Sequence, residues 1–264
     1  MPKILINDFS AHYLSAGKGS VVALLHGFTA NHAMWWQQVP ALVRAGFRVI
    51  APDLRGHGDS DHPGSGYDPD TLADDLRALL DALGLERAHV VGLSLGGMAA
   101  QRFALNFPGR IHTLTVADSF SGPPPPEVME IFHEHEKVGR ERGMDELFGQ
   151  LLIRPALPFG PDYVVPAEWF PALQRTFMKN RLATMTSYIE NLGRLRDWTA
   201  ELDAIACPTL LLVGDADTPC RAPMARMARE IGGATFQVIP RCGHSSAVEK
   251  AEDFNRLMLE RLKR

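Results

Sequence analysis

Short, mostly apolar runs recur along the chain without the strict alternation of a strand that has one wet face. Such runs are typical of strands buried on both faces of a parallel sheet. Six are predicted to be strands, at residues 21–25, 48–51, 88–91, 113–117, 209–213 and 236–239. Helical patterns lie between them, and the clearest has leucines at 72, 76, 79, 80 and 83 on one face, followed by Gly84 as a stop signal. The alternation predicts a mostly parallel sheet flanked by helices.

This alternation stops between residues 120 and 202. Four consecutive prolines follow Gly122, and no strand-like run of the core type appears. The segment nevertheless carries large aromatic side chains, at Phe132, Phe148, Phe159, Trp169, Phe170, Phe177, Tyr188 and Trp198. Because this is enough apolar surface to pack, we expect a mostly helical insertion and not a disordered one. The predicted organisation is a core formed by residues 1–119 and 203–264, with residues 120–202 as a helical cap.

Composition narrows the classes of partner. With 264 residues, 45% of them hydrophobic, the chain can bury a large core. A formal net charge of -4 offers no basic field to nucleic acid or to an anionic membrane, so a small molecule is the expected partner. Three cysteines without a CxxC pair favour reduced, packed thiols. No apolar stretch of about 18 residues and no signal-peptide pattern occurs, so we expect a cytoplasmic protein.

A serine stands among small residues at positions 92–96, which read Gly-Leu-Ser-Leu-Gly directly after a predicted strand and before a predicted helix. A sharp turn at this place presents the Ser94 hydroxyl above the sheet edge, and the helix N-terminus points amide groups at developing negative charge. A serine hydroxyl is a weak nucleophile unless a base takes its proton and a third group orients that base. The sequence must therefore supply two partners.

Both partners can come from loops that follow later strands. Asp215 and Asp217 follow the strand at 209–213, and His244 follows the strand that ends at Ile239. Because the carboxyl ends of parallel strands share one edge, Ser94, one of these aspartates and His244 can converge there, in the chain order Ser, Asp, His. Asp118, after the strand at 113–117, is a third candidate for the acid.

At this point the chain resembles the α/β-hydrolase superfamily over nearly its whole length, and in particular its small bacterial carboxylesterases and 3-oxoadipate enol-lactonases. Residues 25–28, Leu-His-Gly-Phe, resemble the family's oxyanion loop, and residues 52–60 resemble its DxRGxGxS turn. The resemblance implies the α/β-hydrolase fold with a helical cap. It also implies that the backbone N–H groups of Phe28 and Leu95 form an oxyanion hole, and it favours Asp217 over Asp215 and Asp118 as the acid.

The other polar residues of these motifs are interpreted as structural. His26 and His57 are expected to shape their turns, and Asp53 and Arg55 to hold the second loop by hydrogen bonds and ion pairing. Residues 132–136 read Phe-His-Glu-His-Glu, but two histidines separated by two positions point to different sides of a helix. We therefore expect a solvated helical surface there and no metal site.

The function predicted from these motifs is hydrolysis of a carboxylic ester or lactone of a small, largely apolar substrate, with an acyl-enzyme on Ser94, Asp217 and His244 as the other catalytic residues, and no metal or cofactor. Three alternatives stay open. One is a carbon–carbon bond hydrolase of vinylogous diketones, although such enzymes usually have Asn where this chain has Leu93. The others are a cofactor-free haloperoxidase or perhydrolase, and a ligand receptor without catalysis on the same scaffold.

Overall fold

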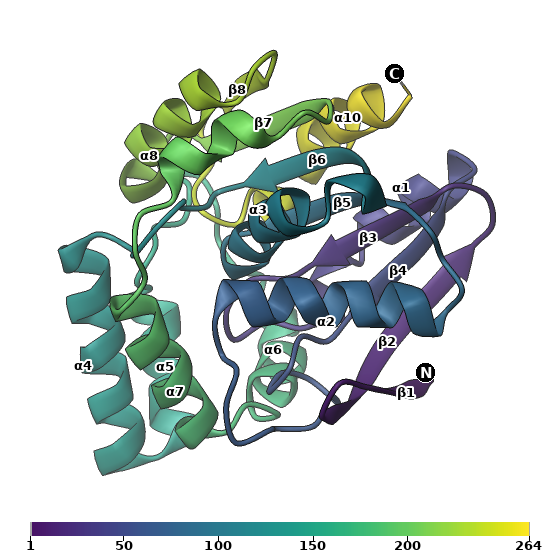
Figure 1. Ribbon diagram of the computed structural model, residues 1–264. Coiled ribbons are helices and arrows are strands. Elements are labelled where there is room, and N and C mark those ends of the chain that lie inside the picture. The colour runs from purple at the N-terminus through teal and green to yellow at the C-terminus, as the bar shows by residue number, and fades with distance from the viewer. Residues whose placement is uncertain (1, 264) are drawn as a thin grey trace.

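A mixed eight-stranded sheet forms the centre of the molecule (Figure 1). The computed structural model describes residues 2–263. The strands are β1 (Lys3–Ile6), β2 (Phe9–Gly17), β3 (Val21–Leu25), β4 (Arg48–Pro52), β5 (Ala88–Leu93), β6 (Ile111–Ala117), β7 (Thr209–Gly214) and β8 (Thr235–Ile239). They lie in the order β1-β2-β4-β3-β5-β6-β7-β8. From β4 through β3, β5, β6 and β7 to β8, each adjacent pair of strands is parallel, so the loops after these six strands open at one edge of the sheet.

The predicted parallel strands are confirmed as β3 to β8, each within two residues of its expected bounds. The sequence pattern did not predict the antiparallel pair β1 and β2, which extends the sheet beyond β4. Phe9, Ala11 and Tyr13 of β2 are buried at alternate positions, which is the signal of a strand with one covered face. Ser10 and His12 interrupt the apolar run, so this strand lacks the continuous apolar pattern of β3 to β8.

Helices cover both faces of the sheet. On one face lie α2 (Pro69–Ala82), α3 (Leu95–Asn106) and α8 (Thr218–Glu230), whose apolar side chains share one core cluster with β3, β5 and β6. On the other lie α1 (Gln38–Arg44) and α10 (Ala251–Leu262). The helix predicted from the leucine pattern is α2, and the Asp68 carboxylate caps it by accepting a hydrogen bond from the backbone N–H of Thr71 (3.0 Å). The mostly parallel, helix-flanked fold class is confirmed.

The segment between β6 and β7 contains no strand within the described residues. It forms α4 (Pro126–Arg142), α5 (Met144–Ile153), α6 (Phe170–Phe177) and α7 (Leu182–Gly193), together with short 3-10 turns η3 (Ala167–Trp169) and η4 (Thr199–Ala204). Figure 1 shows α4, α5 and α7 grouped beside the sheet, on the side toward which the arrows of β3 and β6 point. The helical character predicted for this segment is confirmed, and its helices lie next to the edge where the strand-end loops open.

Three shorter helices complete the described chain: η1 (His32–Trp35), η2 (Pro108–Arg110) and α9 (Ser246–Glu249). Cys207, Cys220 and Cys242 are free thiols, as predicted. None of the helices in residues 2–263 combines the length and apolar character that crossing a membrane requires.

Candidate active site

Ser94 occupies a strained turn between β5 and α3. Its backbone has φ 55° and ψ -118°, a conformation that side-chain-bearing residues rarely adopt. Two hydrogen bonds hold it: the Ser94 N–H donates to the carbonyl of Ala117 (2.9 Å), and the hydroxyl of Ser119 donates to the Ser94 carbonyl (2.7 Å). The turn fixes the direction in which the serine side chain leaves the sheet.

The glycines on either side of Ser94 are required by close packing. A Cβ on Gly92 would lie 2.1 Å from the carbonyl oxygen of Gly96, and a Cβ on Gly96 would lie 2.1 Å from the carbonyl oxygen of Leu25. Because real Cβ atoms do not approach backbone oxygens this closely, only glycine lets β5, α3 and β3 meet here. The small residues of the motif thus serve the turn that carries Ser94.

The backbone N–H groups of Phe28 and Leu95 lie at two loop ends of the same sheet edge. Phe28 follows β3 by three residues, and Leu95 is the first residue of α3. Within residues 2–263, neither N–H has a backbone carbonyl partner in the surrounding turns. Free donors at the start of a helix favour negative charge.

His244 and Asp217 meet on adjacent loops. The imidazole Nδ1 of His244 donates to Oδ2 of Asp217 (2.9 Å), and both side chains are buried, Asp217 completely. Burial by itself disfavours the charged imidazolium, but the attraction of Asp217 outweighs it and raises the pKa of His244 above its ordinary value. No hydrogen bond joins the Ser94 hydroxyl to His244 within the described residues, although both side chains line one cavity. Such a bond is often long in sites without a substrate.

The two rival aspartates have other partners. Asp215 is half-buried, and its carboxylate accepts a hydrogen bond from the backbone N–H of Cys242 (3.1 Å). Asp118 is fully buried; it accepts from the N–H of Gly214 (3.0 Å) and bonds the hydroxyl of Ser246. Burial, together with the negative charge of Asp217, raises the pKa of Asp118 to about 8. Of the three aspartates, Asp217 alone reaches His244.

Two adjoining cavities lie between the sheet edge and the helices of residues 120–202. The inner one, of about 170 Å³, is bordered by Ser94 and His244. The outer one, of about 570 Å³, is bordered mainly by apolar and aromatic side chains, among them Trp36, Phe148 and Trp169. Phe28 and Leu151 line both cavities. A substrate at Ser94 can therefore extend an apolar group outward under these helices.

The prediction that residues 132–136 form a solvated helical surface is wrong for His135, and Phe132 also lines the inner cavity. The His133 side chain is 59% exposed, but His135 is only 3% exposed and lines the inner cavity. α4 packs against α5 and α7, and because a helix turns by about 100° per residue, His135 points inward while His133 and Glu134 are exposed. The two histidines therefore lie on different sides of α4. The Glu136 side chain is only 13% exposed and accepts a hydrogen bond from the hydroxyl of Thr186 in α7 (2.9 Å).

His26 and His57 hold the loop that carries Phe28, as predicted. His26 donates from Nδ1 to the carbonyl of Gly27 (2.8 Å) and accepts at Nε2 from the N–H of Leu54 (2.9 Å). His57 accepts at Nε2 from the N–H of Thr29 (3.2 Å). Burial lowers the pKa of His26 to about 4 and that of His57 to about 3, so both rings are neutral and can donate and accept at once.

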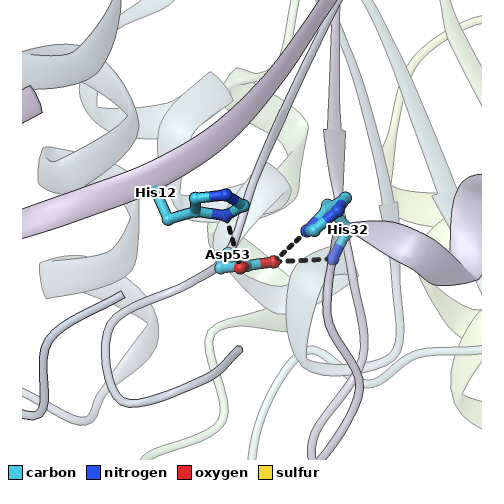
Figure 2. A group of neighbouring side chains, drawn as sticks. All are labelled: His12, His32 and Asp53. Atoms are coloured by element: carbon cyan, nitrogen blue, oxygen red, sulfur yellow. Dashed lines mark hydrogen bonds and ion pairs between the residues drawn. The ribbon is translucent and has the colours of Figure 1, made fainter. Parts of the chain in front are cut away.

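A second buried histidine–carboxylate group lies beside this loop. Figure 2 shows His12 and His32 with their Nδ1 atoms directed at the carboxylate of Asp53, at 2.7 and 2.6 Å. The N–H of Asp59 also donates to this carboxylate (2.9 Å), which agrees with the predicted role of Asp53 in the loop. Burial alone would raise the pKa of Asp53, but the bonds from His32 and Asp59 hold it well below its usual range.

The spacing of this group decides against a metal site. Two ligand atoms that share an ion about 2.1 Å away keep roughly 3 Å or more between them. The nitrogen–oxygen distances of 2.6 and 2.7 Å are those of charge-assisted hydrogen bonds.

Asp217, His244 and Cys220 form another close group, in which the Cys220 Sγ lies 3.6 Å from His244 Nδ1. There too the 2.9 Å contact between Asp217 and His244 is a hydrogen bond.

Glu249 is a site residue that sequence reasoning missed. Its carboxylate accepts hydrogen bonds from the backbone N–H groups of Gly243 (2.8 Å), Ser245 (3.0 Å) and Gly160 (2.7 Å). It therefore fastens the loop of His244 to the segment before α6. No motif marks this residue, because its partners are backbone groups brought together only by the fold.

The chain belongs to the alpha/beta hydrolase family, whose model matches residues 22–257. The enol-lactonase from Burkholderia xenovorans LB400 superposes with a TM-score of 0.87 at 26% identity, with both chains covered completely. A thermophilic esterase from Thermogutta terrifontis has a TM-score of 0.82 at 29% identity, covering 99% of this chain and 97% of that one. The predicted resemblance to esterases and enol-lactonases is confirmed.

A further relative is named for an activity other than that of an esterase or a lactonase. The 2-hydroxy-6-oxononadienedioate/2-hydroxy-6-oxononatrienedioate hydrolase of Paraburkholderia phymatum is 31% identical over 273 residues, covering 96% of this chain and 91% of its own. Family membership and these relatives identify a hydrolase. They leave the bond that it cleaves as a separate question.

Proposed function

We propose that this protein is a serine hydrolase that cleaves a carboxylic ester or lactone through an acyl-enzyme on Ser94. His244 takes the hydroxyl proton as Ser94 attacks the carbonyl carbon, and it then gives that proton to the leaving oxygen. Water attacks the acyl-enzyme by the same route in reverse. Asp217 keeps the imidazole oriented and stabilises its charged form.

The N–H groups of Phe28 and Leu95 are the proposed oxyanion hole. They stabilise the negative charge that forms on the carbonyl oxygen, at about 3 kcal/mol per donor. Their lack of backbone carbonyl partners in the described turns supports this role, because no hydrogen bond must break before substrate binds. His26 and His57 keep the Phe28 loop in place as neutral rings.

Residues 120–202 are proposed to act as the cap that closes the site. Phe132, Met185 and Ile189 from this segment line the inner cavity opposite Ser94. An apolar roof excludes water and strengthens the interactions of the developing charge. The outer cavity suits the more extended, apolar part of the substrate.

The observation that carries the proposal is the shared cavity of Ser94 and His244, with the buried Asp217 bound to the far nitrogen of that imidazole. The test is the initial rate of hydrolysis of p-nitrophenyl esters from acetyl to long acyl chains. Ser94→Ala should lose roughly 10³-fold or more in kcat, with the fold retained. Ser187→Ala, which removes an exposed hydroxyl on α7, is the matched control. Undiminished hydrolysis by Ser94→Ala contradicts the proposal.

A carbon–carbon bond hydrolase is the second candidate, favoured by the identity with the Paraburkholderia hydrolase. Leu93 argues against it, because such enzymes usually have Asn at this position. If folded wild-type protein turns over no ester or lactone but cleaves a vinylogous diketone, this second candidate is correct. Tight binding of small molecules without any turnover would instead indicate a receptor.

A further inference from the structure

The inner cavity receives one polar side chain from residues 120–202. Of the seven residues that this segment contributes, six are apolar: Phe132, Leu151, Ala156, Leu157, Met185 and Ile189. The seventh is His135, which is 3% exposed. An imidazole in such a wall needs an explanation, since burying a polar group is unfavourable unless it is hydrogen-bonded.

One of the two ring nitrogens of His135 has a hydrogen-bond partner. Nε2 lies 2.9 Å from the carbonyl oxygen of Arg154, and because a carbonyl only accepts, the ring proton is on Nε2. Burial lowers the pKa of His135, so the ring is neutral and Nδ1 carries a lone pair. Nδ1 is buried and has no hydrogen-bond partner among residues 2–263. His135, which lines the cavity of Ser94, thus carries a buried hydrogen-bond acceptor that no described residue uses.

We propose that His135 Nδ1 accepts a hydrogen bond from the substrate, and that the natural substrate is an ester or lactone with a hydroxyl or amide N–H group close to its scissile carbonyl. The inference rests on the proposed function, because it needs the carbonyl to sit at Ser94. Ser94 and His135 line the same cavity of about 170 Å³, so a group that reaches His135 belongs to the part of the substrate near the carbonyl at Ser94. The apolar remainder of the substrate lies in the outer cavity.

The test compares esters that differ by a hydroxyl in place of a methyl group. The pairs are p-nitrophenyl 2-hydroxypropanoate with 2-methylpropanoate, and 3-hydroxybutanoate with 3-methylbutanoate, each rate divided by the spontaneous rate in buffer. In wild-type protein kcat/KM should favour the hydroxy ester of at least one pair by roughly tenfold or more. His135→Phe should reduce this preference about tenfold. His133→Phe, the same change on the exposed side of α4, should leave it as in wild type.

A conservative variant separates hydrogen bonding from packing. His135→Gln keeps an amide donor and a carbonyl acceptor, so it should retain more of the hydroxy preference than His135→Phe. If His135→Phe does not fold, the proposal is tested by the hydroxy preference of the wild-type protein and by its change in His135→Gln. Equal normalised rates for both members of each pair in wild type, or a preference that survives in a folded His135→Phe, overturns the proposal. Absence of any Ser94-dependent hydrolysis is a different result, because it removes the proposed function itself.

Discussion

The Nδ1 atom of His244 lies 2.9 Å from Oδ2 of Asp217, while Asp118, buried close by, bonds Gly214 and Ser246 instead. Because Asp217 fixes the imidazole tautomer, Asp217→Asn should lower kcat by roughly 10⁴-fold. Asp118→Asn should stay near wild type, since an amide resembles the protonated carboxyl. Kinetics of the two variants on one p-nitrophenyl ester provide the measurement. The reverse ranking would make Asp118 the catalytic acid.

The pH profile should report His244. A general base works only when neutral, so kcat/KM should rise with pH, and the raised pKa of His244 places the midpoint above the ordinary 6.5. Removing the carboxylate in Asp217→Asn should move the midpoint to lower pH, because the imidazolium loses its stabilising partner. Rates between pH 5 and 9 on an ester with a pH-independent leaving group check this. A midpoint that the substitution leaves in place contradicts the assignment.

Acid should destabilise the fold through its buried neutral histidines. Burial lowers the pKa of His26 and His89 to about 4, and that of His57 to about 3. The unfolded chain takes up protons on these rings near pH 6.5 but the folded chain does not, so the free energy of unfolding should fall as the pH drops from 6.5 toward 4. Each ring contributes up to about 1.4 kcal/mol per pH unit. Urea unfolding at several pH values measures the slope, and a flat profile would mean that the rings are charged in the fold.

Gly96, at the start of α3, should tolerate substitution by alanine far less well than Gly149 in the interior of α5. A Cβ on Gly96 would meet the carbonyl oxygen of His26 at 2.7 Å as well as that of Leu25, so Gly96→Ala should lose about 2 kcal/mol or more of stability. Gly149 lies inside α5 with open space around it, and Gly149→Ala should gain about 0.5–1 kcal/mol. Thermal unfolding of both variants tests the contrast. Similar effects at the two sites would argue against the close packing.

Leu151 lines both cavities, so we expect its side chain to border the passage between them. Leu151→Trp should narrow it, so that long-chain p-nitrophenyl esters lose roughly tenfold in kcat/KM while acetyl esters lose little. Ile153→Trp, at a position 83% exposed, should not change the chain-length profile. A Leu151→Trp protein with the wild-type profile would show that the acyl chain takes another path.

The parallel strands and the Ser94 turn were predictable because local sequence determines them. Apolar runs mark strands covered on both faces, and the Gly-x-Ser-x-Gly pattern marks a strand-to-helix turn. The contact that makes Gly96 necessary, with the carbonyl of Leu25 in β3, is visible only in the fold. The choice among Asp118, Asp215 and Asp217 was open to residue reasoning alone, since all three follow strand ends. Only the fold shows which carboxylate reaches His244.

His135 shows the limit of such reasoning. A run of alternating histidine and glutamate resembles a solvated helix face, and three of its four polar residues are indeed partly or fully exposed. Which one turns inward depends on how α4 packs against α5 and α7. Because the run has no apolar periodicity, the sequence does not show which of its side chains is buried.

The three backbone hydrogen bonds to the Glu249 carboxylate limit how the sequence of the inserted segment can change in evolution. Segments inserted between β6 and β7 look exchangeable, since the two ends of the segment meet at one place, where the N–H of Trp198 donates to the carbonyl of Ser121 (2.9 Å). Here the inserted segment is also tied through Gly160 to the carboxylate that holds Gly243 and Ser245 on either side of His244. The N–H of His244 itself donates to the carbonyl of Pro158 in the same segment (2.8 Å). A chimera that grafts another relative's segment onto this core should therefore disturb His244, the proposed general base, unless it restores a backbone carbonyl at the place of Pro158 and a backbone N–H at the place of Gly160. Recombination between members of the family is then constrained by contacts that no sequence motif marks.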